Sequence, residues 1–421
     1  MKLFLLAIFI VFNVSVRSQD PDFKVMHTLT AENYFKALDL FNHYQDSLSE
    51  KNRLMAHTFL YSYFFQPEKA ILTADTLFMR YKSSLNNTLY IVFATLTAEN
   101  YAYVQDYAKA EAIMSELTNP EGYVMSHAAR ESYEALQIQY AALKKYPPLQ
   151  IVRPNQATTL PLMGATRTHL RIPARINKQT KILMIDTGAA RNVITEKEAK
   201  ELDAKIISEP VIISGYGGKV KGRQALIDEV VLGDIVITNV PFVVIPDNDY
   251  ITEYADGIIG LSLLSRLKEI HISASEGKVI FPVQPANYPI KNNLFIKKGS
   301  MFILSNITTD SLTFFFDSGF NNFFLNQTYY LKERSYIDRV GSKIQLETRG
   351  VGGTERSYAY ELPFYDLTVG TGEVSQIHVS VLPTSEGLAI ANNYGSIGLS
   401  AINRFKWIQI SIETCSINAI P

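Results

Sequence analysis

The stretch KILMIDTGAARNVIT (Lys181–Thr195) joins an apolar run to a tight turn that carries an ionisable side chain. The apolar run before Asp186 has the length and composition of a buried strand. Asp186 then enters a Thr187-Gly188 turn, and Thr195 with Glu198 forms a capping-box pattern that predicts a short helix through about residue 202. A lone Asp-Thr-Gly is a weak motif, because composition alone produces one in roughly one chain in twenty of this size.

A second copy of this stretch follows later in the chain. Residues 312–326 read LTFFFDSGFNNFFLN, in which Asp317-Ser318-Gly319 takes the place of the first turn and Asn326 the place of Thr195. Both correspondences have the same offset of 131 residues (317 against 186, and 326 against 195).

Three further pairs of segments match in the same order along the chain. They are 170–172 with 301–303, Gly215-Tyr216-Gly217-Gly218 with Gly350-Val351-Gly352-Gly353, and DGIIGLSLLSRLKEIHIS (256–273) with YGSIGLSAINRFKWIQIS (394–411). An ordered series of matches at a nearly constant offset indicates an internal duplication. We therefore expect two copies of one unit, each with one Asp at a strand-to-turn junction.

Length and composition predict a globular protein of two or three domains. The chain has 421 residues, 47% of them apolar and 19% charged, which is ample for a sizeable core. The formal net charge of −1 gives no electrostatic reason to expect binding of nucleic acid.

Residues 1–18 are predicted to be a secretory signal peptide. Lys2 supplies the positive start, Leu3–Phe12 the apolar core, and Val16-Arg17-Ser18 a small-residue cleavage site. This core is too short to span a membrane, and no later segment reaches the ~18 apolar residues that a span needs. We expect an exported mature chain with no membrane span.

Cysteine usage refines the expected compartment. Cys415 is the only cysteine, so no intrachain disulfide can form, and a bacterial periplasm or exterior fits better than a eukaryotic secretory route. We expect Cys415 to be a small buried residue and not a nucleophile.

Residues 28–146 are predicted to be helical throughout. Apolar and aromatic residues recur at spacings of three and four, and Pro67 lies where a helix would begin. Lys-Ala pairs follow aromatic-rich helices at 36–37, 69–70 and 109–110. The segment YAYVQDYAKAEAIMSEL (101–117) resembles the inter-helix turn of a tetratricopeptide repeat, although the spacings of 33 and 40 are irregular for that family. We predict helical hairpins in a short solenoid, which either dock a partner protein or substrate, or form a structural domain or pro-region.

Residues 147–162 are predicted to be a linker, because their prolines cannot continue a helix. From residue 163 onward, short β-rich runs alternate with Gly, Asn and Asp. The predicted fold class is therefore N-terminal α-helical hairpins followed by an all-β bilobed region, with lobe 1 at 163–286 and lobe 2 at 287–421.

Two carboxylates on a pseudo-two-fold axis predict a specific chemistry. Like charges a few ångströms apart cannot both ionise cheaply, so the pair would hold one proton. The ionised member could activate a water while the neutral member protonates a carbonyl oxygen, which suits amide hydrolysis without a metal or a covalent intermediate. The two Gly-rich segments, about thirty residues after each Asp, have the flexibility of hairpin tips that fold over an extended chain.

These motifs resemble those of the aspartyl proteases. Asp186-Thr187-Gly188-Ala189, the Gly-x-Gly-Gly tip and Ile258-Ile259-Gly260-Leu261 look closest to the retropepsin-like bacterial branch. Asp317-Ser318-Gly319 and Ser396-Ile397-Gly398-Leu399 repeat the pattern, and two such lobes in one chain resemble the pepsin arrangement. The resemblance covers residues from about 160 to 421.

The resemblance implies a role for each motif residue. Asp186 and Asp317 would be the catalytic dyad, and Gly188 and Gly319 would permit the two turns. Thr187 and Ser318 would hydrogen-bond across the pseudo-dyad. The substrate-binding flaps would be Gly215, Tyr216, Gly217 and Gly218 in lobe 1, and Gly350, Val351, Gly352 and Gly353 in lobe 2. Tyr216 would be either an equivalent of pepsin's flap tyrosine or a surface aromatic.

One departure from the family pattern keeps a second function open. Phe320 follows Asp317-Ser318-Gly319 where a small residue is usual, and it could crowd the second turn. The alternative to an aspartic endopeptidase is therefore a catalytically silent peptide-binding protein that reuses the bilobed cleft.

The remaining patterns favour no other site. The seven His residues lack zinc-ligand spacing, and no phosphate-binding or Gly-x-Ser-x-Gly motif is present in the sequence. We expect no metal and no cofactor, a peptide or protein substrate, and a monomer.

Overall fold

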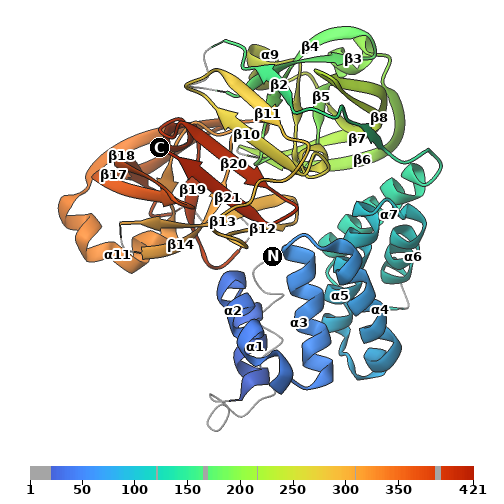
Figure 1. Ribbon diagram of the computed structural model, residues 1–421. Coiled ribbons are helices and arrows are strands. Elements are labelled where there is room, and N and C mark those ends of the chain that lie inside the picture. The colour runs from blue at the N-terminus through green and yellow to red at the C-terminus, as the bar shows by residue number, and fades with distance from the viewer. Residues whose placement is uncertain (1–19, 120–121, 165–168, 216, 309, 385–389) are drawn as a thin grey trace. The chain divides into compact units, whose positions relative to one another are not determined.

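The computed structural model describes residues 20–119, 122–164, 169–215, 217–308, 310–384 and 390–421. The chain divides into a helical unit up to Tyr146 and a β-rich unit from Pro147 onward (Figure 1). The predicted fold class, helical hairpins followed by an all-β bilobed region, is confirmed. The predicted signal peptide at 1–18 and Tyr216 lie outside the described residues.

The helical unit consists of consecutive helices joined by short turns. Its α-helices are α1 (Pro21–Thr30), α2 (Tyr34–Tyr44), α3 (Glu50–Tyr63), α4 (Pro67–Tyr81), α5 (Asn87–Tyr103), α6 (Tyr107–Thr118) and α7 (His127–Leu143). Helices α1 and α2, α3 and α4, and α5 and α6 pack as hairpins, and α7 packs on α6. The helical region starts before the predicted residue 28, because Asp20 caps α1 and Pro21 occupies its first turn.

The three hairpins share one turn geometry. A residue with positive φ precedes the second helix in each, namely Glu32 (φ 59°), Phe65 (φ 54°) and Gln105 (φ 65°). The alanines of the three Lys-Ala pairs follow, and all of them are fully buried: Ala37, Ala70 and Ala110. A methyl side chain at this position lets the second helix of a hairpin pack closely on the first.

The segment predicted to be a linker, 147–162, is partly sheet. Strand β1 (Gln150–Val152) pairs with β8 (Ile235–Ile245), and β2 (Thr158–Pro161) pairs with β11 (Lys278–Phe281). Both added strands lie at the edge of their sheets, where proline does not remove a ladder hydrogen bond that a second neighbour needs. The prolines of this segment correctly predicted that it is not helical, but the two edge strands were not predicted.

Lobe 1 is an eight-stranded sheet in the order β1-β8-β5-β9-β4-β3-β7-β6. Its further elements are β3 (Arg171–Ile176), β4 (Gln179–Ile185), β5 (Val193–Thr195), α8 (Glu196–Glu201), β6 (Lys205–Gly215), β7 (Gly218–Leu232), α9 (Asp249–Tyr254), β9 (Gly257–Ile259) and α10 (Leu261–Leu264). Strand β9 runs parallel to β4 and antiparallel to β5, so it lies between them. Thr195 caps α8 through the amide of Glu198, as the capping box predicted.

Lobe 2 repeats this topology. Its elements are β12 (Leu294–Lys297), β13 (Ser300–Ile307), β14 (Asp310–Phe316), β15 (Phe324–Leu325), α11 (Gln327–Val340), β16 (Ser342–Gly350), β17 (Gly353–Val369), β18 (Gly372–Val381), β19 (Asn393–Ile397) and α12 (Leu399–Ile402). Strand β19 lies parallel to β14 and antiparallel to β15, as β9 does between its own neighbours. The duplication seen in the sequence is therefore a duplication of the fold.

A third, five-stranded sheet joins the two lobes. Strand β10 (Glu269–Ser273) of lobe 1 pairs antiparallel with β20 (Trp407–Ser411) of lobe 2, and β20 pairs with β21 (Ser416–Ile420) (Figure 1). Cys415 is buried at the turn before β21, and burial raises the pKa of its thiol.

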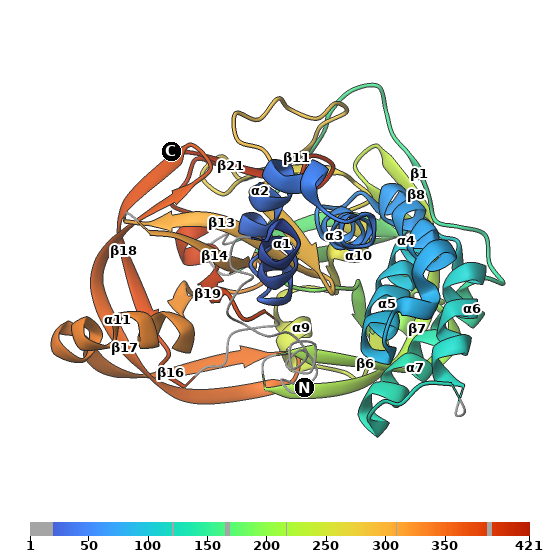
Figure 2. The ribbon, with the colours of Figure 1, turned by 90° about the horizontal axis from the view of Figure 1, so that it is seen from below.

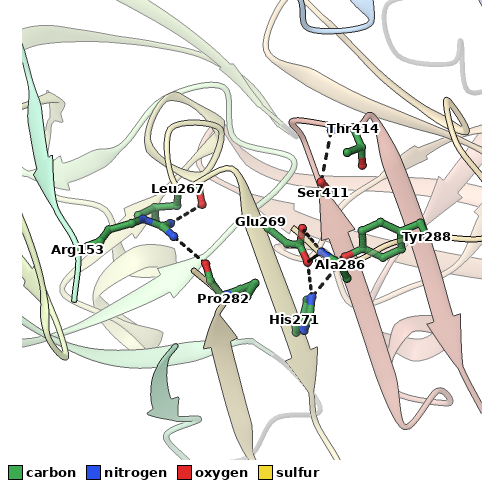
Figure 3. A network of polar contacts seen from close by, with 9 residues as sticks. All are labelled: Arg153, Leu267, Glu269, His271, Pro282, Ala286, Tyr288, Ser411 and Thr414. Carbon is green, nitrogen blue, oxygen red and sulfur yellow. Dashed lines mark hydrogen bonds and ion pairs between the residues drawn. The ribbon is translucent and has the colours of Figure 1, made fainter. Parts of the chain in front are cut away.

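A buried polar cluster fixes the connection between the lobes. The Glu269 carboxylate lies 2.6 Å from His271 Nε2 and accepts hydrogen bonds from the Tyr288 hydroxyl at 2.8 Å and the Ala286 amide at 3.1 Å (Figure 3). These contacts lower the pKa of Glu269 although burial acts in the opposite direction. The segment that leads into lobe 2 is thereby held against the shared sheet.

Candidate active site

The two aspartates occupy equivalent positions at the ends of central strands. Asp186 follows β4, and its amide donates to the Ile259 carbonyl at 3.0 Å; Asp317 follows β14, and its amide donates to the Ile397 carbonyl at 3.0 Å. Both strands lie inside their sheets, with a hydrogen-bonded neighbour on each side. These neighbours fix the end of each strand and therefore the position of the Asp that follows it. The structure thus brings together the two residues that the sequence singled out.

The hydroxyl residues of the two turns hold the lobes together. The Thr187 hydroxyl donates to the Phe316 carbonyl at 3.0 Å and accepts from the Ser318 amide at 2.9 Å. In the reciprocal pair, the Ser318 hydroxyl donates to the Ile185 carbonyl and accepts from the Thr187 amide, both at 3.0 Å. All four groups are buried, so these bonds form in a medium where an unmade bond is costly.

The two glycines let each carboxyl group approach the opposite turn. A Cβ added to Gly188 would lie 2.4 Å from Oδ1 of Asp317, and one added to Gly319 would lie 2.5 Å from Oδ1 of Asp186. Any larger residue at either position would therefore push the carboxyl groups apart.

The environment of the carboxyl groups favours retention of a shared proton. The two side chains hydrogen-bond to each other, and burial is the largest cause of the raised pKa of both, with repulsion from Asp186 adding to the rise at Asp317. Backbone amides act in the opposite direction: Gly188 and Ala189 donate to Asp186 Oδ1 at 2.8 and 3.0 Å, and Gly319 donates to Asp317 Oδ1 at 2.9 Å. The pair therefore contains one group that can accept a proton and one that can donate it.

Phe320 does not crowd the second turn. Its ring packs edge-on against Phe324 at 5.6 Å and belongs to a buried cluster with Ala359 and Leu382. The concern raised by the sequence is therefore not met, because the side chain at this position points into the core of lobe 2.

The predicted flaps are hairpin tips that meet each other. Figure 2 shows the β6–β7 and β16–β17 hairpins running toward one another. A Cβ added to Gly217 (φ +83°) would lie 2.5 Å from the carbonyl carbon of Gly353. A Cβ added to Gly215 would lie 3.8 Å from the Cβ of Val351 and 3.9 Å from the amide nitrogen of Gly352. Within each tip, Gly218 pairs with Gly215 and Gly353 pairs with Gly350. Tyr216 falls outside the described residues, so whether it is an equivalent of pepsin's flap tyrosine or a surface aromatic stays open.

Helix α9 contributes a residue that the sequence argument missed. The Tyr250 hydroxyl donates to the Gly319 carbonyl at 3.3 Å and lies 3.3 Å from His169 Nε2. The bond to Gly319 places this phenol next to the second catalytic turn, where burial and the charges of Asp186 and Asp317 raise its pKa. The only local signal was an Asn-Asp-Tyr start of a short helix, and nothing in it indicates proximity to a turn 69 residues away.

No group of three or more His, Cys, Asp or Glu in the described part of the chain is arranged to hold a metal ion. Among the same residues, no helix combines the length and apolar character needed to cross a membrane.

Part of lobe 1 is similar to a known protein family. Residues 172–263 match a family model described as "Aspartyl protease", a span within lobe 1 that includes Asp186-Thr187-Gly188. The crystal structure of the aspartic proteinase from Irpex lacteus is similar over 63% of this chain and 97% of that chain, with 11% sequence identity and a TM-score of 0.44. No curated protein matches at a significant level.

The family match lies within lobe 1, and the strand order of lobe 2 repeats that of lobe 1.

Proposed function

We propose that the chain is an aspartic endopeptidase that hydrolyses peptide bonds with a water held between Asp186 and Asp317. The observation that carries the proposal is that each of the two carboxyl groups lies against the glycine of the opposite turn, while the turns interlock through Thr187 and Ser318. A structural ion-pair site would not place two like charges in contact. Such a pair is stable only with a shared proton, which is the state that acid–base catalysis needs.

The proposed reaction uses both carboxyl groups in one step. The ionised member takes a proton from the water as its oxygen attacks the carbonyl carbon, and the neutral member gives its proton to the carbonyl oxygen. Collapse of the tetrahedral intermediate then breaks the C–N bond. The departing amine takes a proton from the dyad, and one hydroxyl of the intermediate gives its proton back to the dyad as the new C=O forms, so the dyad again holds one proton. No metal or covalent enzyme intermediate is needed.

The proposal also includes the branch of aspartyl proteases that the chain resembles, the cell compartment in which it acts, and the role of the helical unit. The two similar flap tips favour a retropepsin-like arrangement, and two lobes in one chain favour a pepsin-like one. The N-terminal segment and the single cysteine support export to a bacterial periplasm or exterior. The repeated turns and buried alanines of the helical unit support a tetratricopeptide-like domain that docks a protein partner or substrate.

The alternative, a silent peptide-binding protein, loses its main support. It rested on Phe320, whose ring packs into the lobe 2 cluster. We therefore retain the peptidase as the proposed function.

The test is cleavage of an unstructured protein such as casein by the purified chain, with and without pepstatin. We expect cleavage that pepstatin blocks and that the Asp186→Asn variant lacks. If the wild type and the Asp186→Asn variant both bind a peptide equally well and neither cleaves it, the silent binding protein is favoured instead.

A further inference from the structure

Helix α9 belongs to lobe 1 but contacts two functional parts of lobe 2. Its residue Tyr250 donates to the carbonyl of Gly319, in the second catalytic turn, at 3.3 Å. Its residue Glu253 forms an ion pair at 2.9 Å with Arg349, the penultimate residue of β16 before the flap tip. The capping residue Asn248 donates to the Val351 carbonyl, within the tip itself, at 3.0 Å.

The apolar packing follows the same route. The side chain of Val351 packs against the lobe 1 cluster that contains Ile251, and Ile251 is fully buried. The flap of lobe 2 is therefore held by an ion pair to α9, by a hydrogen bond from the residue that caps α9, and by one apolar contact with the neighbouring lobe 1 cluster. Each of these contacts would be lost when this flap lifts.

The end of helix α9 is anchored within lobe 1. Arg171 donates to the Tyr254 carbonyl at 3.2 Å, and the rings of His169 and Tyr254 lie 4.1 Å apart. Because the helix has only six residues and one end is anchored, a shift of Glu253 tilts the whole helix and changes the position of Tyr250, three residues earlier.

We propose that α9 couples closure of the lobe 2 flap to the positioning of the second catalytic turn, with Tyr250 and Glu253 as the positioning residues. The inference rests on the proposed function for its meaning in catalysis. When the flap is seated, Tyr250 holds the Gly319 carbonyl, and the Gly319 amide then points at Asp317 Oδ1, 2.9 Å away. When the flap lifts, the turn loses this support. Coupling of this kind is reciprocal, so ordering of the turn also favours a closed flap.

A cavity of about 160 Å³ lies where the coupled parts meet. Its lining includes Tyr250 and Tyr254 of α9, Gly319 and Phe320 of the second turn, and Thr348 and Arg349 of the flap strand. A substrate side chain in this space would contact all three elements at once. Substrate binding would therefore strengthen the coupling.

The first experiment uses hydrogen–deuterium exchange and needs no catalysis. In the full-length chain, Glu253→Gln removes the ion pair while keeping a side chain of similar size, and Tyr250→Phe removes only the hydroxyl. We expect Glu253→Gln to speed exchange about fivefold both in the flap hairpin (345–356) and in the second turn (317–322), as expected for a typical coupling between sites. We expect Tyr250→Phe to do the same in the turn.

Arg356→Gln is the matched control. Arg356 pairs with Glu347 within the same hairpin at 2.8 Å, so its loss removes an ion pair of the hairpin and should leave exchange at 317–322 unchanged. If Glu253→Gln loosens the hairpin and leaves 317–322 as in wild type, the coupling is wrong. Because this readout needs no turnover, it can succeed even if the chain hydrolyses nothing, and it can fail in an active peptidase.

The second experiment uses kinetics and pH. We expect Tyr250→Phe to lower kcat about fivefold with little change in KM. The double variant that combines Tyr250→Phe with Glu253→Gln should be no slower than Tyr250→Phe alone, because both changes act through the same helix.

The same variant should also change the pH dependence. Without Tyr250 the Gly319 amide is held less firmly, which weakens a hydrogen bond that lowers the pKa of Asp317, so the basic limb of the pH–rate profile should move up. The charged or titratable groups around Tyr250 are Asp186, Asp317, Tyr254, Arg349 and His169. Of these, His169 has a pKa lowered to about 4 by burial, so it stays neutral on the basic limb. A lower KM with unchanged kcat and profile would overturn the role assigned to Tyr250.

Discussion

The two lobes keep the same catalytic turn but surround it differently. In lobe 1 the turn is followed by Ala189, beside a cluster formed by residues such as Val211 and Ile258, and then by the six-residue helix α8. In lobe 2 the turn is followed by Phe320, which packs with Phe324, and then by the fourteen-residue helix α11. The two catalytic turns at the axis between the lobes therefore have the same structure, whereas the residue that directly follows each turn differs in size and packing.

The difference shows which contacts constrain the sequence. Thr187 and Ser318 each bond to the backbone of the other lobe, so a change in one turn disturbs both. Ala189 and Phe320 face their own lobes, where each core can adjust its packing independently. A duplicated chain can therefore diverge freely at these positions while the paired turn stays the same.

The largest expected effect tests whether the two aspartates are functionally equal. Asp186→Asn and Asp317→Asn should each lower kcat by at least about 10⁴-fold, since each removes one half of an acid–base pair. The double variant should lose little more than either single variant, because the pair acts as one unit. Substantial turnover in one single variant would show that the lobes do not share the chemistry.

The second effect compares the two flap tips. Gly217 (φ +83°) and Gly353 (φ +125°) both have positive φ, so alanine is strained at either position. Only Gly217→Ala adds a clash, because its Cβ would lie 2.5 Å from the backbone of Gly353, whereas a Cβ at Gly353 meets the Gly217 carbonyl oxygen at 3.7 Å. We expect this clash to make the loss in kcat/KM about ten times larger for Gly217→Ala than for Gly353→Ala, which corresponds to about 1.4 kcal/mol. Equal losses would show that the tips separate before substrate binds.

The third effect compares the two interlocking hydroxyls. Thr187→Val and Ser318→Ala should each lower the free energy of unfolding of the β-rich unit by about 2–3 kcal/mol, because each leaves a buried amide and a buried carbonyl unpaired. Thr187→Ser and Ser318→Thr retain the hydroxyl and serve as controls. Urea unfolding would measure all four, and losses that differ more than twofold between Thr187→Val and Ser318→Ala would contradict the symmetry.

The fourth effect concerns stability and pH. The pKa of Asp317 is raised in the folded state, so its contribution to stability is present below the unfolded-state pKa and is lost as the pH rises through the folded-state pKa. Asp317→Asn removes the charge that costs stability at neutral pH. Its Tm should therefore exceed that of wild type at pH 7, and the difference should disappear as the pH falls toward the unfolded-state pKa of about 3.9. A Tm gain that is the same at every pH would rule out ionisation as its cause.

The smallest effect compares the residues that follow the two turns. Neither Ala189 nor Phe320 has a side chain that can donate to a carboxylate, so wild type should have a mildly acidic optimum. Ala189→Ser adds a donor near Asp186 and should move the acidic limb of the pH–rate profile down by about half a unit. Phe320→Leu keeps the lobe 2 cluster apolar and should leave both limbs in place. A wild-type optimum near about pH 2–3 would contradict this argument.

Local sequence patterns predicted much of the fold for identifiable reasons. The apolar run before Asp186, the capping box at Thr195 and Pro67 at the start of α4 depend on neighbours in the chain, and all three occur as expected. The start of α1 at Pro21 and the edge strands at 150–161 were missed. A short edge strand takes its stability from its partner, which lies about a hundred residues away for β1 and β2 alike.

The sequence by itself determined that there are two copies of one unit and that Asp186 and Asp317 are equivalent, because a repeat at a constant offset is a property of the chain alone. Only the tertiary structure decided that Phe320 turns into the core, that the flap tips meet, and that Tyr250 holds the Gly319 turn. These facts depend on distances between residues that are far apart in the sequence and belong to different lobes. The interactions that fix such distances are made across the axis, and no local pattern of residues records them.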